Sequence, residues 1–163
     1  MNAKDAIRSS AALSTMVLKS YISDLDDADL MRRPGEGCNH LAWQLGHLIA
    51  SECMLLESLQ PGAAAELPEG FAAQHDKEKC GEDDPAKFCT KAEYLELFDK
   101  VQAATTAALD KLSEADLDGP APERFREMFP TAGHIYILIA THPMMHAGQF
   151  VPVRRALGKP ILM

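Results

Sequence analysis

The sequence of 163 residues lacks long apolar runs, an excess of basic residues and closely spaced cysteine pairs. No window approaches the roughly 20 apolar residues that a membrane-spanning helix needs, and the first residues contain no apolar stretch of the signal-peptide kind. Sixteen Lys and Arg residues against 24 Asp and Glu residues give a net charge of −8. So acidic a chain repels nucleic acid and anionic membrane surfaces, and we expect neither as a partner.

The four cysteines, Cys38, Cys53, Cys80 and Cys89, include no C-x-x-C pair. Without an export signal, reduced thiols in a cytoplasmic protein are a better interpretation than two disulfides. Cys53 lies in an expected helix and is interpreted as a small buried apolar residue. The other three fall in expected loops, where no motif supports a role as sulfur ligands.

Helical periodicity covers most of the chain, and no stretch shows the alternation of a β-strand. We expect helices over about residues 4–25, 39–59, 90–112 and 131–157, with an irregular segment at 61–89. The length fits one domain. Four amphipathic helices in one small domain are typical of a helical bundle, so the expected fold class is all-α.

Capping signals mark several helix ends. Asn39 is the expected N-cap of the second helix, and Thr90 with Glu93 makes a capping-box pattern before the third. Gly158, followed by Pro160, is expected to end the fourth helix.

A short repeat supports this organisation. Ala-Asp-Leu at 28–30 precedes Gly-His-Leu at 46–48 by the same interval that separates Ala-Asp-Leu at 115–117 from Gly-His-Ile at 133–135. The repeat predicts two similar pairs of helices.

Two of the six histidines, His142 and His146, lie four residues apart on the apolar stripe of the fourth expected helix. Side chains at this spacing are about 5–6 Å apart on one helix face, which suits two imidazoles that bind one divalent ion. Imidazoles buried without a shared partner would be costly. The pattern therefore favours a metal site, and a pair of ordinary core or rim histidines is the alternative.

A third ligand has to come from another element, and geometry sorts the remaining histidines. His134 lies about 12 Å from His142 along the helix axis, too far to share an ion. His75 falls in the irregular segment and is expected at the surface. His40 and His47 share one face of the second helix about 10 Å apart, so only one of them joins the site. His47, in mid-helix, is the better candidate, and His40 is expected to start the helix.

Three further residues are candidates for positions around the ligands. Gln149, one turn beyond His146, is placed to orient that imidazole or to contact a ligand. Glu52 continues the apolar stripe of the second helix; it reaches the site or an adjacent polar network in one interpretation, and the favoured alternative is a solvated carboxylate at the rim. Trp43, four residues before His47, is expected to cover it by packing. No residue is assigned as catalytic, because spacing forces no Asp or Glu into the site.

These residues resemble the DinB-like (DNA-damage-inducible) family of metal-binding proteins. The resemblance rests on Gly-His-Leu at 46–48, on the H-x-x-x-H-x-G-Q element at 142–149 and on the basic residue with Leu-Gly-x-Pro at 155–160. It covers nearly the whole chain and is weakest across 61–89.

The resemblance implies an up-down-down-up four-helix bundle that binds one divalent ion through His47, His142 and His146. Zinc, nickel and iron all suit three histidines, so the metal is left open. Characterised relatives use the metal to activate a low-molecular-weight thiol such as glutathione, mycothiol or bacillithiol, and such proteins are often homodimers. The leading expectation is a metal-dependent transferase or hydrolase that acts on a small molecule. A non-catalytic metal- or ligand-binding module and an interaction protein with a degenerate site are the alternatives.

Pro143 departs from the family pattern directly after the first histidine of the pair. A proline inside a helix removes the hydrogen bond to the carbonyl of Ile139 and disfavours helical geometry at the preceding residue, His142. The sequence therefore predicts a kink at Ile139–Pro143 that re-aims His142 or weakens the site. Pro152 adds a second irregularity.

Overall fold

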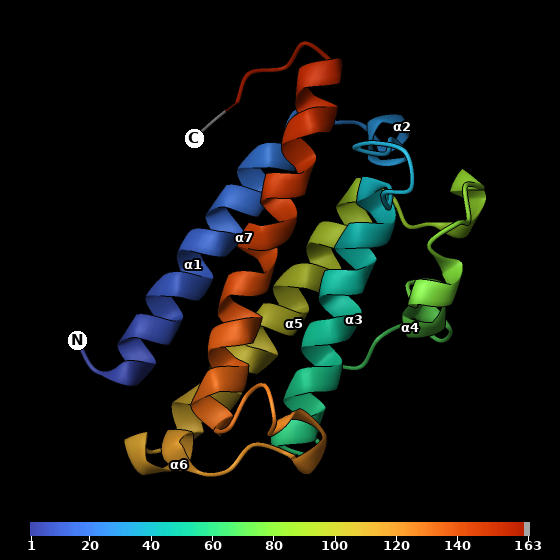
Figure 1. Ribbon diagram of the computed structural model, residues 1–163. Coiled ribbons are helices and arrows are strands. Elements are labelled where there is room, and N and C mark those ends of the chain that lie inside the picture. Colours follow the sequence, from blue (N-terminus) through green and yellow to red (C-terminus); the bar gives the residue numbers. More distant parts are fainter. Residues whose placement is uncertain (162–163) are drawn as a thin grey trace.

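Four long helices form the framework of the protein in a computed structural model that describes residues 1–161 (Figure 1). They are α1 (Ala3–Ile22), α3 (Leu41–Leu59), α5 (Lys91–Lys111) and α7 (Ala132–Ala156). The connections contain the short helices α2 (Asp27–Leu30), α4 (Phe71–Gln74) and α6 (Glu114–Asp118) and the 3-10 turns Lys77–Lys79, Pro85–Lys87 and Glu123–Phe125. Residues 1–161 contain no β-strand, so the predicted all-α fold class is confirmed.

Contacts between helix ends show how the four long helices run. The ammonium group of Lys4, at the start of α1, donates to the carbonyls of Asp110 and Leu112 at the end of α5. Gln60, just after α3, donates to the hydroxyl of Tyr136 near the start of α7. Both pairs are therefore antiparallel, and Figure 1 shows α1 and α7 rising while α3 and α5 descend.

The core lies between the inner faces of the long helices. α1 packs mainly along α7, and α3 contacts both α5 and α7. Burying a large aliphatic or aromatic side chain contributes about 1.5–3 kcal/mol, and many such side chains are fully enclosed here, among them Ile22, Leu41, Ile49, Leu56, Val101, Ile135 and Phe150. Within residues 1–161 no helix has both the length and the apolar character of a membrane span.

The capping patterns set most helix boundaries. Thr90 and Glu93 form the predicted capping box at the start of α5. Gly158 has a φ of +67° just after α7, the left-handed conformation that ends many helices. α1 ends at Ile22 rather than near residue 25, because Asp26 caps a separate short helix, α2.

The expected N-cap Asn39 is wrong, and His40 takes this role. Nδ1 of His40 accepts a hydrogen bond from the backbone N–H of Trp43, and α3 begins at Leu41. Nε2 of His40 lies 3.0 Å from the carbonyl oxygen of Glu82, and the ring is fully buried. The prediction that His40 starts the helix is therefore confirmed.

The two halves of the chain share one order of elements. Each has a long helix, then a short helix opened by a capping box, then another long helix. The capping boxes pair Asp26 with Asp29 in α2 and Ser113 with Asp116 in α6. These are the segments in which the sequence repeat occurs.

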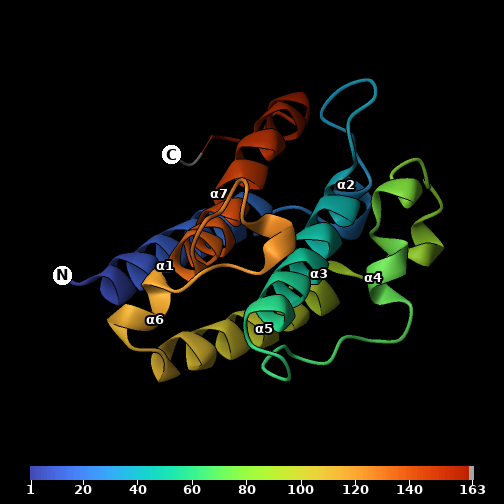
Figure 2. The ribbon, with the colours of Figure 1, turned by 60° about the horizontal axis from the view of Figure 1, so that its bottom comes forward.

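The segment expected to be irregular contains α4 and two 3-10 turns and lies against α3. Figures 1 and 2 both place α4 on the side of α3 away from α1. The part from residue 70 to residue 88, called the strap below, is joined to α3 by the indole N–H of Trp43, which donates to the carbonyl of Asp76 at 3.1 Å. Arg33 adds bonds from its guanidinium to the carbonyls of Cys38 and Cys80.

Candidate metal centre

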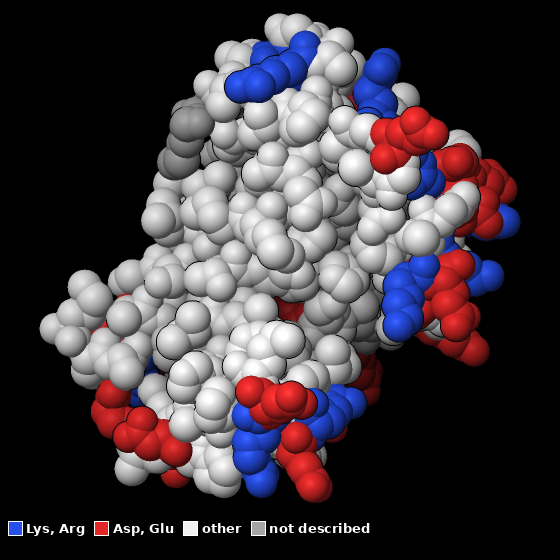
Figure 3. Space-filling model, viewed as in Figure 1, with Lys and Arg blue, Asp and Glu red and all other residues white. Residues whose placement is uncertain are grey.

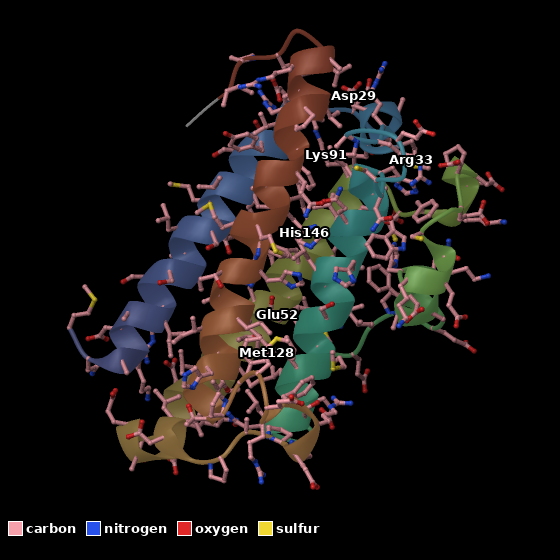
Figure 4. All side chains as sticks on the ribbon, in the orientation of Figure 1. Asp29, Arg33, Glu52, Lys91, Met128 and His146 are labelled. Atoms are coloured by element: carbon pink, nitrogen blue, oxygen red, sulfur yellow. The ribbon has the colours of Figure 1, made fainter. Side chains whose placement is uncertain are left out.

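Three histidines from two helices meet inside the bundle. His47 comes from α3, and His142 and His146 come from α7. One ring nitrogen of each lies within 4.8 Å of the other two. Figure 4 labels His146 between α7 and α3. The structure thus brings together the three residues that the sequence singled out, here called the histidine cluster.

The spacing of the α7 pair suits two ligands of one ion. The Nε2 atoms of His142 and His146 are 3.2 Å apart. Two nitrogens bound to one zinc ion at about 2.0–2.1 Å with tetrahedral angles lie roughly 3.3 Å apart. The ring of His47 faces both, with ring centres 5.4 Å from His142 and 5.5 Å from His146. The donor set therefore fits a divalent ion.

Gln44 fixes the proton position on His146. The amide nitrogen of Gln44 donates to the carbonyl of Asn39 at 2.8 Å, so its oxygen faces the other way. That oxygen lies 2.8 Å from Nδ1 of His146 and can only accept, so Nδ1 carries the proton. The lone pair of His146 is therefore on Nε2, the atom that faces His142. A metal-binding histidine is commonly held in this way by a bond to its other nitrogen.

Burial keeps the histidine cluster uncharged. Removal from water, with a smaller effect of the neighbouring histidines, lowers the pKa of His142 to about 4 and that of His146 to about 3. Burial also lowers the pKa of His47. Neutral imidazoles are the form that binds metal ions, so the cluster is in its ligand form at neutral pH.

Pro143 does not take His142 out of the cluster. α7 continues through Pro143 and Pro152 without an interruption, and Pro143 is itself buried. Nε2 of His142 keeps its 3.2 Å separation from His146. His142 therefore stays within the cluster, and the kink at Ile139–Pro143 and its effect on the strength of the site stay predictions.

Trp43 covers His47, as predicted. The two rings stack with centres 4.9 Å apart and an angle of 8° between their planes. Because the indole N–H is bonded to Asp76, the strap holds the tryptophan and the tryptophan limits the orientation of His47. The hydroxyl of Ser51 lies 3.4 Å from Nε2 of His47.

The expected surface position of His75 is wrong. Its side chain is only 3% exposed, with Nδ1 2.8 Å from the carbonyl of Phe71 and Nε2 2.7 Å from the hydroxyl of Tyr94. A Cβ atom on Gly46 would lie 2.0 Å from this ring, so the glycine makes the room for it. His134 stays apart from the cluster, at the start of α7, and bonds Thr131.

Glu52 is buried, and the favoured expectation of a solvated rim carboxylate is wrong. Its side chain is 4% exposed and accepts hydrogen bonds from Gln102 at 2.7 Å and from the hydroxyl of Thr105. Figure 4 shows it in the interior below His146. Burial raises the pKa of Glu52 to about 7, although both bonds act in the opposite direction. The alternative of an adjacent polar network is the one that the structure shows.

Gln44, rather than Gln149, holds the imidazole of His146. Gln149 is exposed to solvent. Gln44 is fully buried, and sequence reasoning missed it. An uncharged amide within the otherwise apolar run 41–46 was the available signal, because a buried amide needs a partner. Among the described residues the metal-ligand group contains no cysteine, and Cys53 is buried as expected.

A family model described as the DinB superfamily matches residues 12–150, which is most of the chain and includes all three histidines. The chain belongs to the DinB superfamily. No curated protein shows significant similarity to it. In this DinB protein, membership of the family and the buried histidine cluster are together compatible with metal binding.

Arg154, just before the motif at 155–160, has a structural role in this DinB protein together with Lys159 of the motif. The guanidinium of Arg154 is fully buried and donates to the carbonyls of Pro160 and Tyr21 and to the carboxylate of Asp24. Lys159 donates to the backbone carbonyl of Asp24. Arg154 and Lys159 therefore fasten the end of α7 to the end of α1.

Proposed function

We propose that this member of the DinB superfamily binds one divalent metal ion through His47, His142 and His146 and is an enzyme that acts on a small molecule. The observation that carries the proposal is the assembly of three uncharged imidazoles in one group. Zinc, nickel and iron all suit such a donor set. The net charge of −8 favours a small-molecule substrate over nucleic acid.

Three protein ligands leave at least one position of the ion open. An ion held there supplies Lewis acidity, which lowers the pKa of a water or a thiol that reaches the open position. The chain's own residues prepare the site: Gln44 keeps the lone pair of His146 directed inward, and Trp43 holds the ring plane of His47. With the family resemblance, this supports transfer to a low-molecular-weight thiol, or hydrolysis, as the reaction class.

A non-catalytic metal- or ligand-binding module is the second candidate, and one observation favours it. The carboxyl group of Glu52 is buried, and it is bonded to Gln102 and Thr105 and not to a histidine. Within residues 1–161, this buried carboxyl group is therefore committed to its own network and not to the cluster. An interaction protein with a degenerate site has less support, because the three histidines are assembled despite Pro143.

We also propose a cytoplasmic homodimer. α7 carries no Asp, Glu, Lys or Arg from residue 132 to residue 153, yet Ile137 and Met145 are 53% and 57% exposed. Figure 3 shows that most of the face over α7 and α1 is free of charged side chains. An uncharged face with exposed aliphatic side chains is typical of a protein interface.

Substitution of His146 by Ala tests the metal site. Without its Nε2 ligand the protein should lose stoichiometric divalent metal, measured by elemental analysis of protein purified without a histidine tag. His134→Ala is the matched control, because His134 lies on the same helix outside the cluster. Equal metal content in the two variants would refute the ligand assignment.

Thiol conjugation then separates the enzyme from the binding module. Metal-loaded protein is incubated with an electrophile and glutathione, mycothiol or bacillithiol, and product formation is compared with that of His146→Ala. Thiol-dependent turnover that the variant loses supports the transferase. Stoichiometric metal without turnover in this screen or in a hydrolysis screen supports the non-catalytic module.

A further inference from the structure

A cleft of about 480 Å³ lies between α1, α5 and α7, and none of the three clustered histidines lines it. Its walls are mainly aliphatic, with Ile7, Ala11, Leu109, Ile139 and Ala140 contributing from the three helices. Small-molecule sites in proteins are typically about 300–1,000 Å³ and largely apolar, with a few converging polar groups. The volume and the lining of this cleft agree with that description.

Three polar residues of the cleft belong to one hydrogen-bonded chain that ends at Glu52. The hydroxyl of Thr15 lies 3.3 Å from the amide oxygen of Gln102, and the amide nitrogen of Gln102 donates to Glu52. The hydroxyl of Thr105 donates to the other oxygen of Glu52. Thr15, Gln102 and Thr105 line the cleft, whereas Glu52 is not among its lining residues. The amide and hydroxyl oxygens keep unused lone pairs, so they can accept a hydrogen bond from a bound N–H or O–H group.

The charges around the cleft disfavour an ionic ligand. Arg8 is the one charged residue in the lining, and its guanidinium is already paired with Asp5 and Asp110. An anionic head placed at Gln102 would approach the buried carboxyl of Glu52 without an unpaired cation in the lining. An ion moved into an apolar site without a partner pays a large desolvation cost.

We propose that this cleft binds an uncharged small molecule with an apolar body and one hydrogen-bond-donating head, such as a primary amide. The apolar body lies against the aliphatic walls, and the head donates to Gln102 and Thr15. The proposal does not rest on the metal, because the cleft and the histidine cluster share no residue.

Octanamide is the probe, and octanoate is the matched anionic compound with the same chain length. Each is titrated into the ¹⁵N-labelled full chain in the presence of a chelator, and backbone amide shifts are followed by NMR. We expect saturable shifts at residues of the cleft with octanamide and at least tenfold weaker binding of octanoate. Ala12→Phe fills the cleft from an exposed position on α1 and should weaken octanamide binding at least tenfold. Ala107→Phe, on an exposed position of α5 outside the lining, should leave it unchanged.

The same titrations can overturn the proposal. Absence of saturation up to the solubility limit of octanamide, equal binding by the Ala12→Phe variant, or octanoate binding as tight as that of octanamide would each contradict it. If a second copy of the chain covers the cleft, sedimentation would show a dimer that Ala12→Phe dissociates. That result would also contradict the proposal. Loss of metal in His146→Ala has no effect on these outcomes, so failure here is distinct from failure of the proposed function.

Discussion

The histidine cluster and the Glu52 network are two groups of polar side chains in one bundle, and they differ in what satisfies their polar atoms. Glu52 receives a donor on each carboxylate oxygen, from Gln102 and Thr105. In the cluster, the Nε2 atoms of His142 and His146 lie 3.2 Å apart, and the lone pair on Nε2 of His146 is satisfied either by a proton on His142 or by a shared cation. The carboxylate is thus held by neutral donors, whereas the three imidazoles are arranged so that they could be ligands of one ion.

The same cause gives the two groups opposite responses to pH. Burial disfavours the charged form of each, so it lowers the pKa of His142 and His146 and raises the pKa of Glu52. The contribution of the two histidines to the free energy of unfolding is fully present above their unfolded pKa of about 6.5 and is lost as pH falls toward 4. For Glu52 it is complete below an unfolded pKa of about 4.5 and is lost as pH rises to about 7.

The largest expected effect is the acid sensitivity of the metal-free cluster. Between pH 6.5 and 4, His142 and His146 bind protons in the unfolded chain but stay uncharged in the folded protein. The free energy of unfolding should therefore fall by up to about 1.4 kcal/mol for each of them per unit of pH decrease. Urea unfolding in chelator at pH 7, 6 and 5 measures this slope. The double variant His142→Gln, His146→Gln should show a shallower slope, and His134→Gln should not. If the unfolding free energy changes with pH equally in the unchanged protein, the double variant and His134→Gln, the histidine cluster does not have the acid sensitivity that sets it apart from Glu52.

Substitution of Glu52 by Gln should have the opposite pH dependence. The amide keeps the shape and does not ionise, so the variant avoids a loss on the order of 1.4 kcal/mol per pH unit between pH 4.5 and about 7. The gain in unfolding free energy relative to the unchanged protein should therefore be greater at pH 7.5 than at pH 5. Glu96→Gln, on an exposed position of α5, is the control for the lost charge. A gain that is the same at both pH values would show that ionisation of Glu52 is not its cause.

The smallest expected effect comes from loss of the hydrogen bond between Gln44 and His146. Gln44→Leu removes the acceptor for Nδ1 of His146 and should weaken metal binding about 10–100-fold while the three ligands remain. Competition with a metal-sensing dye measures the affinity. Gln149→Leu, the same change at the exposed glutamine of α7, should leave it unaltered. If Gln149→Leu is the variant that loses affinity, the assignment of the orienting residue is reversed.

Residues that depend on helical spacing could be predicted from the sequence, and those that depend on tertiary contacts could not. His142 and His146 share a helix face at any bundle geometry, and the all-α fold follows from the periodicity. Gln44 acquires its role only when α7 brings His146 beside it, 102 residues further along the chain. Glu52 and His75 were misplaced for the same reason, because Thr105 and Tyr94, which satisfy them, lie on α5.

The fastening of α7 to α1 by Arg154 has a consequence for the order of assembly during synthesis. Arg154 and Asp24 are 130 residues apart in the chain, so the ribosome releases α1 long before its main packing partner. Contacts of such long sequence separation form late and slowly. His142 and His146 are delivered by the same last helix. Under the proposed function, metal uptake therefore has to wait until α7 has been translated and has packed against the rest of the bundle.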